Sequence, residues 1–263
     1  MDLTSLLGVL IGFIAVIGAM IFKKISFTVF LNPAAFFVIF VGTAATILNS
    51  FTGKQLKSLG ALFGIIMKKT KGLEEVEIIS TMVNLSTAAR KEGLLALEKN
   101  IEAIDDPFIK KAVRLVVDGV EEDAIRDILE GEIAAMSARH EENASIFSSA
   151  GAYAPTLGVL GAVFGLIAAM SHIDNTDAMA EAIAAAFIAT ILGIFTGYVL
   201  WNPFAKKLKV KSHEEAFCKY LVVEGALALY RGDSPIKIKE KLISVLPQKK
   251  QAKVYEELEK SKG

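Results

Sequence analysis

The sequence predicts an all-α integral membrane protein, with four transmembrane helices in two hairpins and a large helical insert between the hairpins. Composition is the first observation: the 263 residues are 53% hydrophobic and 22% charged, with a mean hydropathy of +0.47. That is too apolar for an ordinary soluble domain and too charged for a membrane bundle alone. The second observation is that residues outside the apolar stretches follow a helical periodicity. The third observation is the presence of four long apolar windows. The windows span residues 3–22, 30–50, 147–170 and 178–202.

Each window reaches the roughly 20 apolar residues that a hydrocarbon core of about 30 Å requires. The first three contain no Asp, Glu, Lys or Arg, and the fourth contains only Glu181, close to one end. A buried core helix is the alternative for any one window, but four windows of this length favour spans. The first window lacks a basic leader and a small-residue cleavage site, so we expect it to be retained.

The lysines that flank the windows predict the orientation of the chain, because basic residues accumulate on the cytoplasmic side. The turn at 23–29 has two lysines and the turn at 171–177 has none, so both turns are expected outside. The insert and the terminal segment are then cytoplasmic, as are both termini. The lysines are Lys23 and Lys24 in the first turn, Lys54, Lys57, Lys68, Lys69 and Lys71 after the second window, and Lys206, Lys207, Lys209 and Lys211 after the fourth.

The windows divide the chain into hairpin 1 (1–50), a cytoplasmic helical domain (51–146), hairpin 2 (147–202) and a C-terminal cytoplasmic region (203–263). In the helical domain, Asp106-Pro107 predicts a capped helix start and Asp118-Gly119 a helix end. A long helix is expected after Trp201-Asn202-Pro203, running to about Tyr230. A turn at 231–235, a short last helix and a solvated tail beyond residue 247 should follow.

Small residues recur on the predicted spans at intervals of three and four. Helices in lipid associate through such smooth faces, since burial of apolar surface gains little there. Packing within the chain accounts for part of the pattern, and we expect the remainder to serve an oligomer or a partner helix. The residues are Gly8, Gly12 and Ala19 on the first span, Gly158, Gly161, Ala162 and Gly165 on the third, and Ala185, Ala189, Gly193 and Gly197 on the fourth.

Pro155 removes a backbone donor, which leaves two interpretations. It either loosens the third span as a hinge, or it occupies a helix start where proline is tolerated. Pro203 has the same ambiguity at the exit of the fourth span.

The predicted spans lack an ionisable residue at mid-membrane, whereas an ion pathway normally contains one. Hydroxyls are present instead. Either the protein moves no ion, or a second chain supplies a carboxylate to one of the smooth faces. The hydroxyl groups belong to Ser149, Thr190, Thr196 and Tyr198.

Several other functions find no support in the sequence. The single Cys218 excludes an intramolecular disulfide, and His140, His172 and His213 are too scattered for a usual zinc site. No catalytic set is evident, and GVLGAVFG has neither the preceding strand nor the GK[ST] of a phosphate loop. The net charge of zero gives no argument for nucleic acid. We therefore expect no enzyme, no metal and no cofactor.

Three segments resemble the flagellar-motor stator subunits of the MotA/TolQ/ExbB proton-channel family. They are ARKEGLLALE, APTLGVLGAVFGLIAAMSHIDNT and AAFIATILGIFTGYVLWNPFAKKL. The likeness covers nearly the whole chain, and the four-span layout separates it from the three-span TolQ and ExbB relatives.

The resemblance implies a homo-oligomeric ring of five copies around two copies of a MotB-type single-span partner, in the bacterial cytoplasmic (inner) membrane. The partner's membrane aspartate would carry the proton and its outer domain would grip peptidoglycan. Proton flow down the motive force would turn the ring, so that region 51–146 transmits torque to a FliG-type rotor switch protein. Lipid is the other expected contact.

The resemblance also assigns residues to the ion path. Pro155 and Pro203 match prolines that couple ion flow to torque, and Thr190 matches a polar position that lines the path. Ala162 matches a position where sodium-driven stators carry threonine. Because a methyl group cannot coordinate sodium, this residue favours protons.

Arg90 and Glu98 match the charged pair that meets the rotor. From the residues alone they would be a solvated helix face. On an unbroken helix they would lie about 80° apart around the axis and about 12 Å along it. The alternatives are a sodium-driven stator, an ExbB/TolQ-like energiser of an outer-membrane system, and a passive membrane scaffold.

Overall fold

The computed structural model describes residues 3–25, 32–68, 74–94 and 97–260, and every regular element within them is a helix. Part of the predicted turn at 23–29, the start of the second window, Lys69 and Lys71 lie outside the described residues. The chain divides into two compact units. We call Met1–Thr70 with His140–Val210 the membrane unit, and Lys71–Arg139 with Lys211–Gly263 the polar unit.

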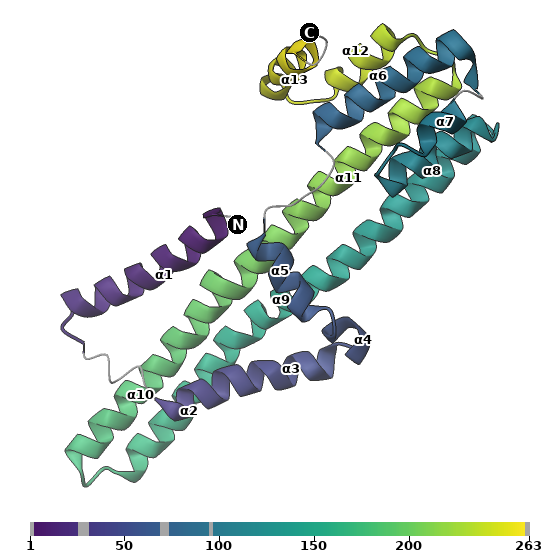
Figure 1. Ribbon diagram of the computed structural model, residues 1–263. Helices are drawn as coiled ribbons and strands as arrows, with labels where there is room; N and C mark the ends of the chain where they lie inside the picture. Colours follow the sequence, from purple (N-terminus) through teal and green to yellow (C-terminus); the bar gives the residue numbers. More distant parts are fainter. Residues whose placement is uncertain (1–2, 26–31, 69–73, 95–96, 261–263) are drawn as a thin grey trace. The chain divides into compact units, whose positions relative to one another are not determined.

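The membrane unit contains the predicted spans (Figure 1). Four helices among the described residues are long and apolar enough to cross a membrane, which confirms the four windows. The third and fourth extend beyond their windows into the polar unit. The elements are α1 (Leu3–Phe22), α2 (Pro33–Phe36), the π-helical turn η2 (Phe37–Val41), α3 (Gly42–Ser50), α4 (Gly53–Leu56), α5 (Leu59–Met67), the later part of α9 (Glu122–Ser171), α10 (Thr176–Phe195), the π-helical turn η4 (Thr196–Trp201) and the start of α11 (Asn202–Tyr230).

Local capping explains where two of these helices begin. Asn32 accepts a hydrogen bond from the Ala35 N–H at 3.0 Å, and Pro33 follows at the first helical position of α2. Asn175 accepts from the Ala178 N–H at 3.1 Å and starts α10. Each amide satisfies a donor that the first helical turn leaves without a partner.

Different helices cover different sides of the α9 and α10 pair in Figure 1. α1 packs on the end of α10 and on η4, with the Phe13 and Phe195 ring centroids 5.0 Å apart. The segment from α2 to α3 packs on α10 and on α9, where Gly42 faces the Leu157 side chain. α1 therefore rests on the later part of the fourth span, whereas the segment from α2 to α3 rests on both α9 and α10.

An aromatic cluster closes the end of the membrane unit from which α11 leaves. Phe63 of α5, Phe147 of α9, Trp201 of η4 and Phe204 of α11 have ring centroids 5.2 to 6.5 Å apart. Aromatic pairs at these separations contribute roughly 0.5–1.5 kcal/mol beyond area burial. The cluster fixes α5 onto the helices that leave the span.

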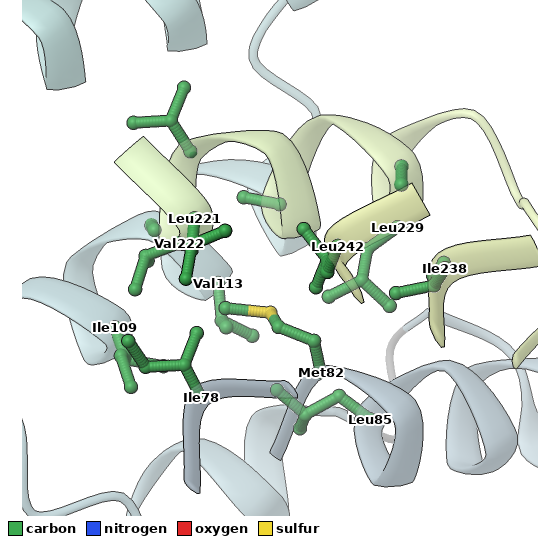
Figure 2. Close-up of a cluster of buried hydrophobic side chains, with 14 of the residues drawn as sticks. Ile78, Met82, Leu85, Ile109, Val113, Leu221, Val222, Leu229, Ile238 and Leu242 are labelled. Carbon is green, nitrogen blue, oxygen red and sulfur yellow. The ribbon is translucent and has the colours of Figure 1, made fainter. Parts of the chain in front are cut away.

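The polar unit is a helical bundle with one hydrophobic core. Its elements are α6 (Glu75–Glu92), α7 (Leu97–Ile101), α8 (Pro107–Val117), the earlier part of α9, the later part of α11, α12 (Pro235–Ser244) and α13 (Gln248–Lys260). Figure 2 shows Met82 of α6 reaching into the core towards Val113 of α8, with Leu221 and Leu242 close by. All four side chains are at most 2% exposed. Burial of each such side chain stabilises the unit by about 1.5–3 kcal/mol.

The predicted helix ends in this unit are confirmed. The Asp106 carboxylate accepts from the N–H groups of Phe108 and Ile109, both at 2.9 Å, and Pro107 begins α8. α8 ends at Val117, and Gly119 adopts a positive φ of 68°, which favours glycine. The long helix to Tyr230 and the short helix after the 231–235 turn are also present.

The predicted solvated tail is wrong. Residues from Gln248 to Lys260 form α13, in which Val254 and Leu258 are 3% and 7% exposed. The Lys250 ammonium pairs with the Glu75 carboxylate at 2.5 Å and so connects α13 to α6. The segment is folded because α6 and α12 cover its few apolar side chains.

Asp233 holds the turn between α11 and α12. Its carboxylate lies 2.6 Å from the Lys237 ammonium and 3.7 Å from Nε of Arg231. The hydrogen bond from Lys237 is the main reason that the pKa of Asp233 is lowered below 3.8; burial opposes the shift. A carboxyl whose pKa is lowered by folding stabilises the fold at pH values above its unfolded-state pKa. This contribution is lost as the pH falls through its folded-state pKa.

We expect Asp233→Asn to destabilise the polar unit by about 1 kcal/mol at pH 7, because the ion pair is lost while the shape is kept. The difference from the native protein should narrow as pH falls below 3.8 and disappear below the lowered folded-state pKa of Asp233, where the carboxyl is protonated in the folded protein as well. Unfolding of the full-length protein at pH 7 and pH 3 measures this. Glu102→Gln, at a side chain 71% exposed, is the control, and an Asp233→Asn effect that does not vary with pH contradicts the prediction.

Candidate functional site

α9 and α10 run antiparallel and meet along a seam of small residues. The contact is backbone to backbone: a Cβ on Gly193 would lie 2.6 Å from the Ala154 carbonyl oxygen and 2.9 Å from Cα of Gly158. A Cβ on Gly165 would lie 2.9 Å from Cα of Ala186. Close approach of this kind is how helices gain van der Waals contact in lipid. We define the seam as Gly158, Gly161 and Gly165 of α9 with Ala186, Ala189 and Gly193 of α10 and Gly197 of η4.

The seam changes the interpretation of the smooth faces. Packing within the chain was expected to account for part of the small-residue pattern, and it accounts for every glycine of the seam. On the first span, Gly12 packs on the Val199 side chain, whereas a Cβ on Gly8 would meet nothing within 4 Å. A partner helix in contact with α9 and α10 must therefore use a surface beside the seam.

Pro155 lies inside α9, so the helix-start interpretation is wrong. Proline has no N–H, and residue 155 therefore cannot donate to the Gly151 carbonyl four residues earlier. That carbonyl oxygen and Cγ of Pro155 would each lie 2.8 Å from a Cβ on Gly197. Gly197 thus makes room for both the ring and the carbonyl that the ring leaves without its usual donor.

Thr190 and Ala162 lie on the same edge of the seam as Pro155. Ala162 follows Pro155 by seven residues, which places them about 20° apart around α9. Cα of Thr190 would lie 3.4 Å from a Cβ on Gly158. All three residues are half-buried, between the packed seam and exposed side chains. Because α9 and α10 are antiparallel, the edge of α9 that carries Pro155 and Ala162 and the edge of α10 that carries Thr190 lie on the same side of the helix pair.

We call this side the free face. Exposed apolar side chains continue it on both helices, and within the described residues α2 and η2 cover the opposite edge, through Val38 at Gly161. α1 covers η4 instead. The free face consists of Pro155, Val159, Ala162 and Leu166 of α9 with Phe187, Thr190 and Ile194 of α10.

The hydroxyl groups beside the free face bond to their own helix. Thr190 Oγ1 donates to the Ala186 carbonyl at 3.3 Å and retains lone pairs that can accept. Thr196, 2% exposed, donates to the Leu192 carbonyl at 2.9 Å and belongs to the packed side. No Asp, Glu, Lys, Arg or His occurs from 147 to 170 or from 182 to 202. The face can accept a hydrogen bond, but it cannot carry a proton by itself.

Pro203 is not part of this arrangement. It is exposed and follows η4 at the start of α11. π-helical turns inside α-helices are frequent at functional sites, and a proline two residues after one removes a further backbone donor.

Arg90 and Glu98 lie on separate helices, so the expectation of one unbroken helix is wrong. α6 ends at Glu92, and Gly93 has a φ of 86° that favours glycine. Glu98 lies in the first turn of α7. Both side chains are exposed, and neither takes part in an ion pair within the described residues.

Two glycines of the site carry signals that sequence reasoning missed. Gly93 follows Arg90 and Lys91 in the last turn of α6, and basic residues before a glycine are a usual signal for the end of a helix. Gly151 stands four residues before Pro155, where the carbonyl loses its donor. Each signal is local and could have been found from the sequence.

The comparisons with known proteins find the same kind of relative over nearly the whole length of the chain. The model of the MotA/TolQ/ExbB proton channel family matches residues 100–217. Motility protein A of Bacillus subtilis is 47% identical over 263 residues, covering 100% of this chain and 97% of that protein. Chemotaxis protein PomA of Vibrio alginolyticus is 32% identical, covering 96% and 98%.

Two solved structures are similar to the fold. The flagellar MotAB stator complex from Bacillus subtilis contains a chain with a TM-score of 0.89 and 48% identity, covering 95% of this chain and 98% of that one. A chain of C. jejuni MotAB has a TM-score of 0.88 and 29% identity, covering 94% and 97%.

Proposed function

Since the chain belongs to the MotA/TolQ/ExbB proton channel family and is a flagellar-motor stator subunit rather than an enzyme, we propose that its free face forms the wall of the proton path. One observation carries the proposal: Pro155, Ala162 and Thr190 lie together beside a packed seam, on a surface without ionisable groups. A second helix must then bring the carboxylate. The MotAB complexes among the similar structures support a MotB-type partner in that role.

For the assembly we propose the arrangement that the resemblance implies, with the free face turned towards the partner. Five copies, each presenting the free face inward, would surround two partner helices whose aspartates take up and release the proton. The hairpins 1–50 and 147–202 would form the outer and inner membrane layers. Both termini, the region 51–146 and the region 203–263 would be cytoplasmic in the inner membrane.

The coupling ion is tested by the swimming speed of a strain that lacks its own stator and carries this chain with its cognate partner. Protonophore and sodium are varied independently. Because Ala162 offers a methyl group in place of an oxygen ligand, we expect speed to collapse with the protonophore and to ignore sodium. Speed that follows sodium identifies a sodium-driven stator. No motility with either ion, despite stable assembly, favours an ExbB/TolQ-like energiser or a scaffold.

The rotor surface is proposed to include Arg90 and Glu98, which would contact a FliG-type switch protein. Both charges are exposed at the break between α6 and α7. Electrostatic complementarity mainly sets the rate and specificity of such contacts. The ion path and the rotor surface should therefore be separable by mutation.

We expect Arg90→Ala combined with Glu98→Lys to lower swimming speed about tenfold, since two rotor contacts are lost or reversed. Proton conductance of a constitutively conducting complex should stay unchanged. Lys253→Ala, at a lysine on α13 that is 73% exposed, is the control. Loss of proton conductance in the double variant at normal expression would refute the separation of the ion path from the rotor surface.

A further inference from the structure

A groove of about 390 Å³ opens between the first turns of α1 and the exit of the fourth span. α1 and η4 touch at Gly12, where a Cβ would lie 2.5 Å from Cγ1 of Val199. One turn earlier, a Cβ on Gly8 would meet nothing within 4 Å. The two helices therefore diverge over a single turn, and bare backbone at Gly8 lines the groove.

The two ends of the groove differ in chemistry. Val9, Val199 and the ring of Tyr198 provide apolar walls, and Tyr198 is 65% exposed. At the other end lie Thr4, Ser5 and Lys207, with the Lys207 ammonium donating to Thr4 Oγ1 at 3.0 Å. Lys207 is the one charged residue among the described groove residues, and its charge is positive.

The lysines from 206 to 211 mark the edge of the membrane. The polar end of the groove is therefore at the depth of the lipid headgroups, and the apolar end is in the hydrocarbon. A phosphodiester needs hydrogen-bond donors and a positive charge, which a lysine and two hydroxyls supply. An acyl chain needs an uncharged channel without projecting side chains, which the backbone at Gly8 supplies.

We propose that this groove binds an anionic phospholipid, with its phosphate at Thr4, Ser5 and Lys207 and one acyl chain along Gly8. The lipid fills the wedge that α1 and η4 leave between them, and it holds the first turns of α1 in place. A zwitterionic headgroup has no net charge to complement Lys207 and should bind more weakly. Pro203, which the resemblance assigns to coupling, also lines the groove, but the groove contains no residue of the free face and neither Arg90 nor Glu98.

Native mass spectrometry of the full complex with its partner, in mild detergent, tests the proposal. Phosphatidylglycerol or phosphatidylcholine is added, and retained lipid is counted. The native complex should prefer phosphatidylglycerol. Gly8→Leu, which fills the groove, and Lys207→Gln, which removes the charge, should each lower its retention about five- to tenfold. Lys207→Arg should restore it.

Two matched controls come from the same segments. Gly18→Leu adds the same side chain to α1 at a glycine that also has open space but lies outside the groove. Lys206→Gln removes an exposed lysine that does not line the groove. Both should retain lipid as the native complex does. If Gly8→Leu fails to assemble, Lys207→Gln with its own control carries the test.

A photoreactive label at Ser5→Cys, in a Cys218→Ser background, identifies the occupant directly. Cross-linking to lipid supports the proposal. Cross-linking to a second copy or to the partner chain makes the groove a helix-docking site and overturns it. Equal retention of the two lipids by the native complex, or unchanged retention in both groove variants, overturns it as well.

Discussion

Replacing Gly193 by valine is expected to abolish swimming and to prevent normal assembly of the complex. A Cβ at this position would lie 2.6 Å from the Ala154 carbonyl oxygen and 2.9 Å from Cα of Gly158. Both are backbone atoms, so no side-chain rotation can relieve the overlap and the helices must separate. Overpacking of a tight core costs typically about 1–3 kcal/mol, and the displaced seam also carries Thr190 and Pro155 out of position.

Gly18→Val is the control for this variant, because it adds the same side chain to a membrane helix where nothing lies within 4 Å. The amount of complex in membranes, the thermal stability of the purified complex and swimming speed are measured together. Native levels of all three in Gly193→Val would show that the seam is looser than the structure describes.

Pro155→Ala should also abolish swimming, but for a different reason and with assembly intact. Proline in a helix interior costs about 3 kcal/mol relative to alanine, so the variant should be at least as stable as the native protein. Alanine restores the N–H that bonds the Gly151 carbonyl, and it removes the ring from Gly197. The Gly151 carbonyl beside the free face then has its usual donor within α9, and we expect the motion that accompanies proton transfer to stop.

The control is Pro33→Ala, because Pro33 begins α2 at a position where the missing donor is harmless. Swimming speed, proton conductance and the melting temperature of the complex separate the two effects. A Pro155→Ala variant that swims normally would rule out the coupling role. One that assembles poorly would make Pro155 a packing residue instead.

The spans were predictable because the thickness of the bilayer sets a length that few soluble helices match. The ends of α8 were predictable because Asp106 and Gly119 act on groups within a few residues of themselves. α13 was not, since its apolar residues are few and their burial depends on α6 and α12, which are distant in sequence. The seam was only half predictable, because a smooth face fits a helix of the same chain as well as one from another chain. Pro155 shows the same limit: its position inside α9 depends on where the helix begins, at Glu122.

The backbone contact at Gly193 also limits how such a sequence can evolve. The atoms opposite it belong to the main chain at 154 and 158, and these atoms are the same for every amino acid. No substitution on α9 can therefore compensate for a larger residue at 193. Gly12 differs, because it faces the side chain of Val199. A larger side chain at position 12 can be offset by a smaller one at position 199. These two positions can therefore change together in evolution, whereas Gly193 cannot change.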